Sequence, residues 1–261
     1  MKRVLLIADI CKDIYHMGHA DRISPEAPVP VFVQDHNIVS DGMRLNVYNN
    51  LKKLQLAVTP IYPTKVSFKH RYVDIKSKQQ LIRVDEDAKQ VSCDLDLRSG
   101  VKWNEIDAVV VSDYDKGFIR FSFLDDLIQT AKIYNIPVFV DSKKKNVFEL
   151  SDCILKINEK ELAETGEKFA AQTSKWNNIK LIVTYGDRGA KYQDTHWFPV
   201  KKKVEVRDVT GAGDTFLAAL VYQYLHSNSY LDAIRFANKA ASITVQKFGT
   251  YAPTIQEINR V

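Results

Sequence analysis

Continuous apolar runs of strand length recur along this chain and alternate with stretches of helical periodicity. The first run, RVLLIA at residues 3–8, ends at Asp9, and similar runs follow at 107–112, 137–140, 153–157 and 180–184. A run without alternation is typical of a strand that is buried on both faces. Helices are expected at residues 44–56, 122–134, 212–225 and 230–247. This order predicts an α/β fold around a mainly parallel sheet.

Two segments interrupt the alternation. Residues 14–38 are rich in proline and include a short apolar run, and residues 66–92 carry short stretches with alternating apolar positions. Alternation of this kind predicts solvent-facing antiparallel strands. We therefore expect a single domain over residues 1–261, in which the two segments form a small β layer beside the main sheet.

The composition argues against several classes of function. The 261 residues carry a net charge of +5, and lysine runs occur only at 143–145 and 201–203, where we expect a solvated surface or a nearby anionic ligand. No basic helix interleaved with aromatic residues occurs, so nucleic acid is not expected as a partner. No stretch reaches the ~18 apolar residues of a membrane helix, and the first apolar run is too short for a signal peptide.

The cysteines and histidines do not indicate a metal site. Cys11, Cys93 and Cys153 are odd in number and far apart, so we expect neither a disulfide framework nor a cysteine-ligated metal. This usage suits a reducing compartment, and we predict a cytoplasmic protein. Of the six histidines, only His16 and His19 are close in sequence, so a zinc site is not expected.

Glycine is scarce, with 10 residues among 261, whereas about 7% is usual. Two of them, Gly211 and Gly213, lie in the heptapeptide DVTGAGD at residues 208–214, directly before an apolar helix pattern. Glycines at a helix start let the backbone approach an anionic ligand, which the first N–H groups and the helix dipole favour. Asp214 in the first turn could accept a proton from an attacking hydroxyl, as the base of a kinase does. A glycine-rich turn with an ordinary helical aspartate is the alternative.

The heptapeptide resembles the signature of the ribokinase-like (PfkB) carbohydrate kinases. The stretch RISPEAPVPV at residues 22–31 narrows the resemblance to the D-glycero-D-manno-heptose 7-phosphate kinases, which form the kinase domain of the bifunctional heptose kinase/ADP-heptose synthase. Weaker matches follow in the right order at residues 79–85, 112–117, 158–161, 183–186 and 237–241. The resemblance spans nearly the whole chain. It implies a three-layer α/β sandwich with a mainly parallel central sheet and a β lid made of residues 14–38 and 66–92.

The resemblance also implies a role for each matching residue. Asp214 would be the catalytic base, and the backbone of Gly211, Ala212 and Gly213 would form an anion hole. ATP would be bound by Asn158, Glu161, Thr184, Gly186 and Asn238, and Glu161 would hold Mg²⁺ indirectly. The sugar would contact Asp13, Gly42, Asn46, Asp113 and Lys116. The alternatives are a helix cap at Asn158 together with a solvated Glu161, a solvent-facing helix position for Asn238, and a surface lysine for Lys116.

Two lid arginines, Arg71 and Arg83, are candidates for clamping a substrate phosphate, although packing or surface pairing would explain them equally well. The chain departs from the family pattern elsewhere on the acceptor side. Met43 stands where relatives have the second glycine of a pair, Asp115 stands for a glycine and Ser142 for a proline.

A strand–helix–strand unit that relatives have before the lid strands is missing after Leu54, so we expect the sheet to lose strands on one side. The phosphate-handling motifs are intact. The kinase pattern finishes close to Val261, and we expect no nucleotidyltransferase half in this chain.

We therefore expect an ATP- and Mg²⁺-dependent kinase that phosphorylates D-glycero-D-manno-heptose 7-phosphate at O1, giving the 1,7-bisphosphate for ADP-heptose and lipopolysaccharide biosynthesis. Its expected partner is a small-molecule sugar phosphate, with neither nucleic acid nor membrane, and a homodimer through the lid is the default expectation. Two alternatives stay open. One is a kinase of the same fold for another sugar phosphate or a nucleoside, and the other is a non-catalytic relative that binds nucleotide or sugar.

Overall fold

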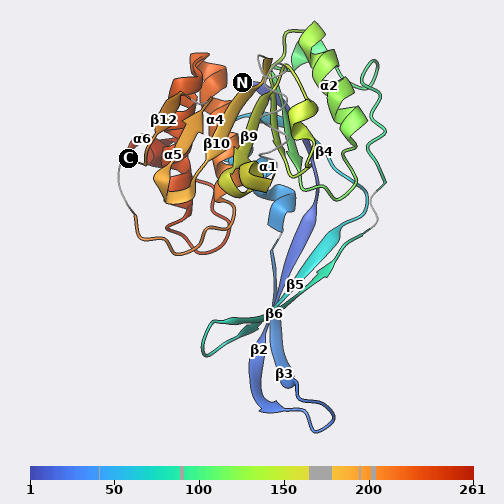
Figure 1. The fold of residues 1–261 in the computed structure, drawn as a ribbon, viewed down its shortest axis with the longest axis vertical. Coiled ribbons are helices and arrows are strands. Elements are labelled where there is room, and N and C mark those ends of the chain that lie inside the picture. The colour runs from blue at the N-terminus through green and yellow to red at the C-terminus, as the bar shows by residue number, and fades with distance from the viewer. Residues whose placement is uncertain (41, 89–90, 165–177, 194, 201–203) are drawn as a thin grey trace.

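Two β-sheets form the framework of the protein in the computed structural model (Figure 1). The structure describes residues 1–40, 42–88, 91–164, 178–193, 195–200 and 204–261. Within these ranges, an eight-stranded sheet carries helices on both faces, and a four-stranded sheet projects away from it.

The large sheet has the strand order β12-β11-β10-β9-β8-β7-β1-β4. Its strands are β1 (Arg3–Ala8), β4 (Ala57–Ile61), β7 (Ala108–Asp113), β8 (Val138–Ser142), β9 (Ile154–Asn158), β10 (Lys180–Thr184), β11 (Ala190–Tyr192) and β12 (His196–Phe198). The strands from β4 to β10 run parallel, and the last two pair antiparallel. The five strands expected from apolar runs are confirmed within two residues. Three short strands were not expected, because β4 contains Pro60 and the other two have only three residues each.

Helices cover both faces of this sheet, as the alternation predicted. The helices are α1 (Gly42–Lys53), α2 (Phe121–Ile133), α4 (Ala212–Ser227), α5 (Tyr230–Thr244) and α6 (Ile255–Asn259), and 3-10 turns lie at Trp103–Glu105, Val147–Glu149 and Gly186–Arg188. Along β1, Leu6 packs with α1, α4, α5 and α6, whereas Leu5 and Ile7 pack with α2. The result is a three-layer α/β sandwich, which confirms the predicted fold class (Figure 1). In the described part of the chain, no helix combines the length and apolar character needed to cross a bilayer.

The small sheet has the order β3-β2-β5-β6. Its strands are β2 (Cys11–Ile23), β3 (Pro30–Ser40), β5 (Ser67–Asp74) and β6 (Gln80–Glu86). The two outer pairs are antiparallel, but the central β2–β5 pair is parallel, so the expectation of antiparallel pairing throughout was wrong. The second segment also ends earlier than expected, since its last strand stops at Glu86 and Cys93 is already buried against the main sheet.

The sheet is short on the side of β4. Among the described residues, β4 is the edge strand next to β1, and α1 leads into it through residues 54–56 alone. The connection therefore has no room for a further strand–helix–strand unit at this point.

Candidate active site

The carboxyl ends of the parallel strands and the start of α4 meet at one edge of the large sheet. Asp113 ends β7, Asn158 ends β9 and Thr184 ends β10. In open α/β sheets, ligands bind beyond the carboxyl ends of the strands, so this edge is the expected place for a site.

The glycines of the heptapeptide shape the start of α4. Gly211 is the N-cap residue, with a φ of 79°, and a Cβ there would lie 2.4 Å from Nδ2 of Asn46. Both the left-handed backbone and the close approach require glycine. The N–H of Ala212 donates to the carbonyl of Val209 at 3.2 Å. Of the three residues expected to form the anion hole, Ala212 therefore has its N–H turned to the protein in this structure.

Asp214 lies in the first turn of α4 and is 6% exposed. Its Oδ2 accepts a hydrogen bond of 2.6 Å from Asn46, and its Oδ1 accepts one of 2.9 Å from the hydroxyl of Tyr114. Burial raises the pKa of Asp214, the hydrogen bond from Asn46 opposes that rise, and the net shift is upward. A buried carboxylate held by two neutral donors, with a raised pKa, has the properties of a general base.

Asn46, which was expected at the sugar, lies against Asp214. Its Nδ2 donates to Oδ2 of Asp214 and, at 3.4 Å, to the carbonyl of Gly211, while its Oδ1 accepts from Asn50 at 3.1 Å. The side chain is 4% exposed. Both ends of the amide are thus engaged inside the protein, and one of them holds the Asp214 carboxylate.

A cavity of about 680 Å³ lies beside the start of α4. Its lining includes Asn158, Thr184, Gly186, Ala212, Gly213 and Asn238. Ligand pockets typically measure about 300–1,000 Å³, so the cavity can take a nucleotide-sized ligand. Four of the five residues expected at ATP are thus brought together. Asn238 also donates to the carbonyl of Phe198 at 2.9 Å, so this residue is not solvent-facing.

Asn158 and Glu161 are joined by two hydrogen bonds. The N–H of Asn158 donates to Oε2 of Glu161, and Oδ1 of Asn158 accepts from the N–H of Glu161, both at 2.8 Å. This reciprocal pairing caps the helical residues 159–164. A cap at Asn158 was part of the alternative considered for this pattern, but the Glu161 side chain takes part in the cap and was expected there to be solvated. The pairing holds both side chains at the end of β9, where Asn158 also lines the cavity.

Lys156 in β9 also lines the cavity, and the sequence reasoning missed it. Its Nζ lies 2.6 Å from Oδ2 of Asp141, and its side chain is 6% exposed. A Cβ on Gly213 would lie 3.1 Å from that Nζ. Burial lowers the pKa of Lys156, but the Asp141 carboxylate outweighs this effect, so the pKa is raised and the ammonium stays charged. The available signal was a lysine inside a continuous apolar run, because a buried charge must be paired.

On the acceptor side, Asp13 lies in β2 and is 6% exposed. Nε of Arg71 donates to its Oδ1 at 3.0 Å, so the lid strand β5 reaches into the site.

Burial raises the pKa of Asp208, but hydrogen bonds from Thr210 and Gly249 and the charge of Arg71 outweigh it, leaving the pKa lowered. Arg83, by contrast, pairs with Asp85 on the exposed strand β6.

Asp113, which was expected at the substrate, is engaged with other residues of the protein. Its Oδ2 accepts from Ser142 at 2.6 Å and lies 3.4 Å from Nζ of Lys144, and the residue is 1% exposed. Nζ of Lys144 also lies 2.5 Å from Asp115, whose φ is 57°. The charges of this cluster are therefore paired with one another.

In the first lysine run, Lys143 and Lys145 are exposed, as a solvated surface requires, whereas Lys144 is buried in this cluster. The second run, 201–203, lies outside the described residues. Lys116 pairs with Asp87 at 2.7 Å. Gly42 begins α1, and the side chain of Met43 lies outside the described residues.

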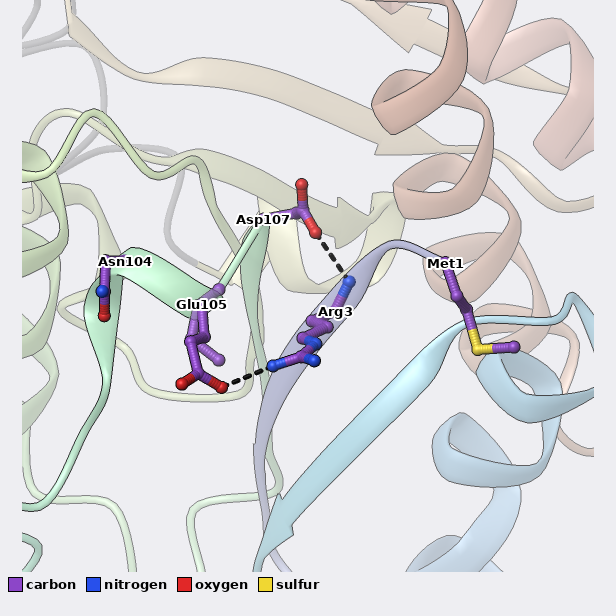
Figure 2. A pocket seen from close by; sticks show the side chains of 6 residues that line it. Met1, Arg3, Asn104, Glu105 and Asp107 are labelled. Carbon is purple, nitrogen blue, oxygen red and sulfur yellow. Dashed lines mark hydrogen bonds and ion pairs between the residues drawn. The ribbon is translucent and has the colours of Figure 1, made fainter.

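A second hollow has a volume of about 440 Å³ and is lined by residues around the amino-terminal end of β1; Figure 2 shows its lining side chains. Arg3 pairs there with Glu105, and Asp107 accepts from the backbone of Arg3 and from Lys2. These charges neutralise one another at the end of the sheet opposite to the usual ligand side. No three His, Cys, Asp or Glu residues gather as a metal site within the described ranges.

Comparison with known proteins agrees with this geometry. The family model for pfkB family carbohydrate kinases matches residues 106–257. The bifunctional protein HldE of Helicobacter pylori (strain J99) is 29% identical over 306 residues, which cover 99% of this chain and 66% of the relative. The bifunctional protein HldE of a Nitratiruptor species is 33% identical over 303 residues, which cover 98% of this chain and 64% of the relative. The chain thus spans about two thirds of these relatives, and the aligned stretches exceed its 261 residues, so the relatives have segments without a counterpart here.

Solved structures show the same fold. Ribokinase from Thermotoga maritima superposes with a TM-score of 0.68 at 18% identity, covering 100% of this chain and 99% of its own. Phosphofructokinase-2 from Escherichia coli superposes with a TM-score of 0.72 at 16% identity, and the match covers 100% of this chain and 98% of that structure's chain. The fold is therefore ribokinase-like, and the chain belongs to the pfkB family of carbohydrate kinases.

Proposed function

We propose that this carbohydrate kinase transfers the γ-phosphoryl group of ATP to O1 of D-glycero-D-manno-heptose 7-phosphate. The observation that carries phosphoryl transfer is the Asp214 carboxylate, held by Asn46 and Tyr114 in the first turn of α4 beside the large cavity. Support for the heptose acceptor comes from the stretch at residues 22–31. It also comes from the 29–33% identity to HldE proteins over 98–99% of the chain, against 16–18% for ribokinase and phosphofructokinase-2.

In the proposed reaction, Asp214 accepts the proton of the acceptor hydroxyl as that oxygen attacks the γ-phosphorus of ATP, and the bond from this phosphorus to the bridging oxygen breaks, so that ADP leaves. The N–H of Gly213 and the positive end of the α4 dipole face the charge that builds on the transferred group. Lys156 supplies a full positive charge next to Gly213. These groups are fixed before the substrate arrives, which is the condition for electrostatic stabilisation of a transition state.

We place the nucleotide in the cavity lined by Thr184, Gly186 and Asn238. Asn158 lines this cavity, and Glu161 is joined to Asn158 by two hydrogen bonds. The oxygen atoms of an amide and a carboxylate suit Mg²⁺, which is usually held by one or two carboxylates together with substrate phosphates. Glu161 would hold the ion, and the ion when bound would neutralise charge on the phosphates. Glu161 remains ordered for this task because its cap with Asn158 fixes the helix start.

The acceptor would bind where Asp13 and Arg71 are now paired. We propose that Asp13 binds sugar hydroxyls and that Arg71 turns to the 7-phosphate, because an arginine fork matches a phosphate. The lid would then close over both substrates and exclude water. Lys116 remains a candidate substrate contact, although it is paired with Asp87 in this structure.

The proposal includes a homodimer through the lid and a cytoplasmic location. The lid strands expose apolar side chains, among them Val33, Ile38, Ile82 and Val84, which a second copy could cover. All three cysteines are buried and unpaired, as expected in a reducing compartment. Sedimentation of the intact chain against a variant with Ile82→Lys and Val84→Lys tests the dimer.

Another acceptor is the second candidate, because the chain lacks segments of its relatives and because we expect the departures at Met43 and after Leu54 to lie on the acceptor side. A coupled ADP-release assay with heptose 7-phosphate, fructose 6-phosphate, ribose and a nucleoside separates the two. We expect turnover with heptose 7-phosphate and a 1,7-bisphosphate product identified by phosphorus NMR. Turnover with one of the other acceptors and none with heptose 7-phosphate would overturn the proposed substrate.

A further inference from the structure

Tyr114 reaches the predicted base from a different element than the rest of the site. It lies in the loop directly after β7, and its hydroxyl donates to Oδ1 of Asp214 at 2.9 Å. Burial, and after it the neighbouring carboxylates of Asp214 and Asp141, raise the pKa of Tyr114 well above its ordinary value. The phenol is therefore protonated at neutral pH and acts as a hydrogen-bond donor to the carboxylate.

The backbone that carries this phenol is firmly held. Oδ2 of Asp9 accepts from the N–H of Tyr114 at 2.7 Å and from the N–H of Lys116 at 3.3 Å. The N–H of Asp115 donates to Oδ1 of Asp113 at 2.9 Å. Asp9 and Asp113 are each 1% exposed, so both anchors lie inside the protein. These hydrogen bonds fix the backbone of the loop and thereby hold the hydroxyl of Tyr114 in one position.

Four groups face the Asp214 carboxylate from four different elements. Asn46 of α1 and Tyr114 after β7 donate hydrogen bonds to it, Lys156 of β9 contributes a positive charge, and Asp141 of β8 contributes a negative one. Asn46 binds Oδ2 and Tyr114 binds Oδ1, so each oxygen of the carboxylate has one neutral donor. Together the two hydrogen bonds fix the plane of the carboxylate. Each carboxylate oxygen still has a lone pair that can accept the proton of an incoming hydroxyl.

We propose that Tyr114 is a positioning residue for phosphoryl transfer, which fixes the orientation of Asp214 and stabilises its ionised form through the phenol hydrogen bond. This inference rests on the proposed role of Asp214 as the base. It adds to the reaction a tyrosine whose loop is anchored by the buried carboxylate of Asp9.

The test is Tyr114→Phe, which removes only the hydroxyl. Loss of a hydrogen bond to the ionised form favours the protonated one, so the acid limb of the pH profile of kcat/KM moves upward by about one pH unit. Tyr251→Phe is the matched control, because it removes a phenol–carboxylate hydrogen bond of 2.6 Å, to Glu257, that does not involve Asp214. The control is expected to keep the wild-type acid limb.

A second measurement does not depend on turnover. The carboxyl carbon of Asp214, assigned by its loss in Asp214→Asn, is titrated by ¹³C NMR in the wild type and in both tyrosine variants. We expect a higher pKa in Tyr114→Phe alone, and a lower one when 3-fluorotyrosine, a stronger donor, replaces Tyr114. Identical titrations in all of these proteins overturn the proposal. Failure of heptose 7-phosphate as a substrate would overturn the proposed acceptor but leave this titration decisive.

Discussion

Replacement of Lys156 by methionine tests a charged residue that lines the cavity in which we place the nucleotide. The change keeps the length of the side chain and removes its charge, which leaves the Asp141 carboxylate without its partner at 2.6 Å. Removing one member of a buried pair costs about 3–5 kcal/mol. Because the Asp141 side chain is 14% exposed and keeps some contact with water, we expect the free energy of unfolding to fall by about 3 kcal/mol.

The same change should reduce activity for a separate reason. Lys156 lies next to Gly213, where we place the transferred phosphoryl group, and its charge also favours the ionised form of Asp214. A hydrogen bond to a charged group contributes about 1.5–3 kcal/mol. Its loss corresponds to a decrease of roughly 10- to 100-fold in kcat/KM.

A double variant separates the two effects. In Lys156→Met with Asp141→Asn, neither charge remains, so urea denaturation should show most of the lost stability restored. The ADP-release assay should still show the reduced kcat/KM, because the positive charge at the phosphate position is absent. Lys145→Met, which changes the net charge as the single variant Lys156→Met does but at an exposed position, is the control for that variant. Wild-type activity in the double variant would refute the reasoning, since Lys156 would then matter only through its ion pair.

Two further predictions concern other carboxyl groups of the site. Burial and the Asp113 carboxylate raise the pKa of Asp9 from 3.8 to about 6. This group therefore contributes stability that is fully present below its unfolded pKa and is lost as the pH rises through about 6. Asp9→Asn should flatten this pH dependence of unfolding by about 3 kcal/mol in urea titrations, and an unchanged slope would speak against the raised pKa. Glu161→Gln can keep the cap on Asn158 through its amide oxygen but loses the charge. We expect it to raise the Mg²⁺ concentration for half-maximal activity by about tenfold or more, and an unaltered Mg²⁺ titration would remove Glu161 from the proposed ion site.

The sequence predicted those parts of the structure that depend on local pattern. The five central strands are buried on both faces, and their continuous apolar runs showed it, whereas β4 is an edge strand interrupted by Pro60. The heptapeptide likewise located the start of α4, because its glycines report a backbone requirement that is visible in the residue type itself.

Pairings between distant residues were harder to predict. Asn46 and Tyr114 meet Asp214 across separations of 168 and 100 residues, and no local pattern indicates which groups converge. Asp113 was expected at the substrate because it ends a central strand. Its burial depends on Lys144, which lies in a lysine run that reads as solvated surface.

The most direct test of the central claim is the ADP-release assay with ATP and D-glycero-D-manno-heptose 7-phosphate on Asp214→Asn. Asp126→Asn, which removes an exposed carboxylate of α2 outside the site, is the control. The account predicts that Asp214→Asn lowers kcat roughly 10²- to 10⁴-fold while calorimetry shows ATP binding retained, and that Asp126→Asn keeps wild-type turnover. Turnover in Asp214→Asn equal to that of the wild type would contradict the assignment of Asp214 as the base.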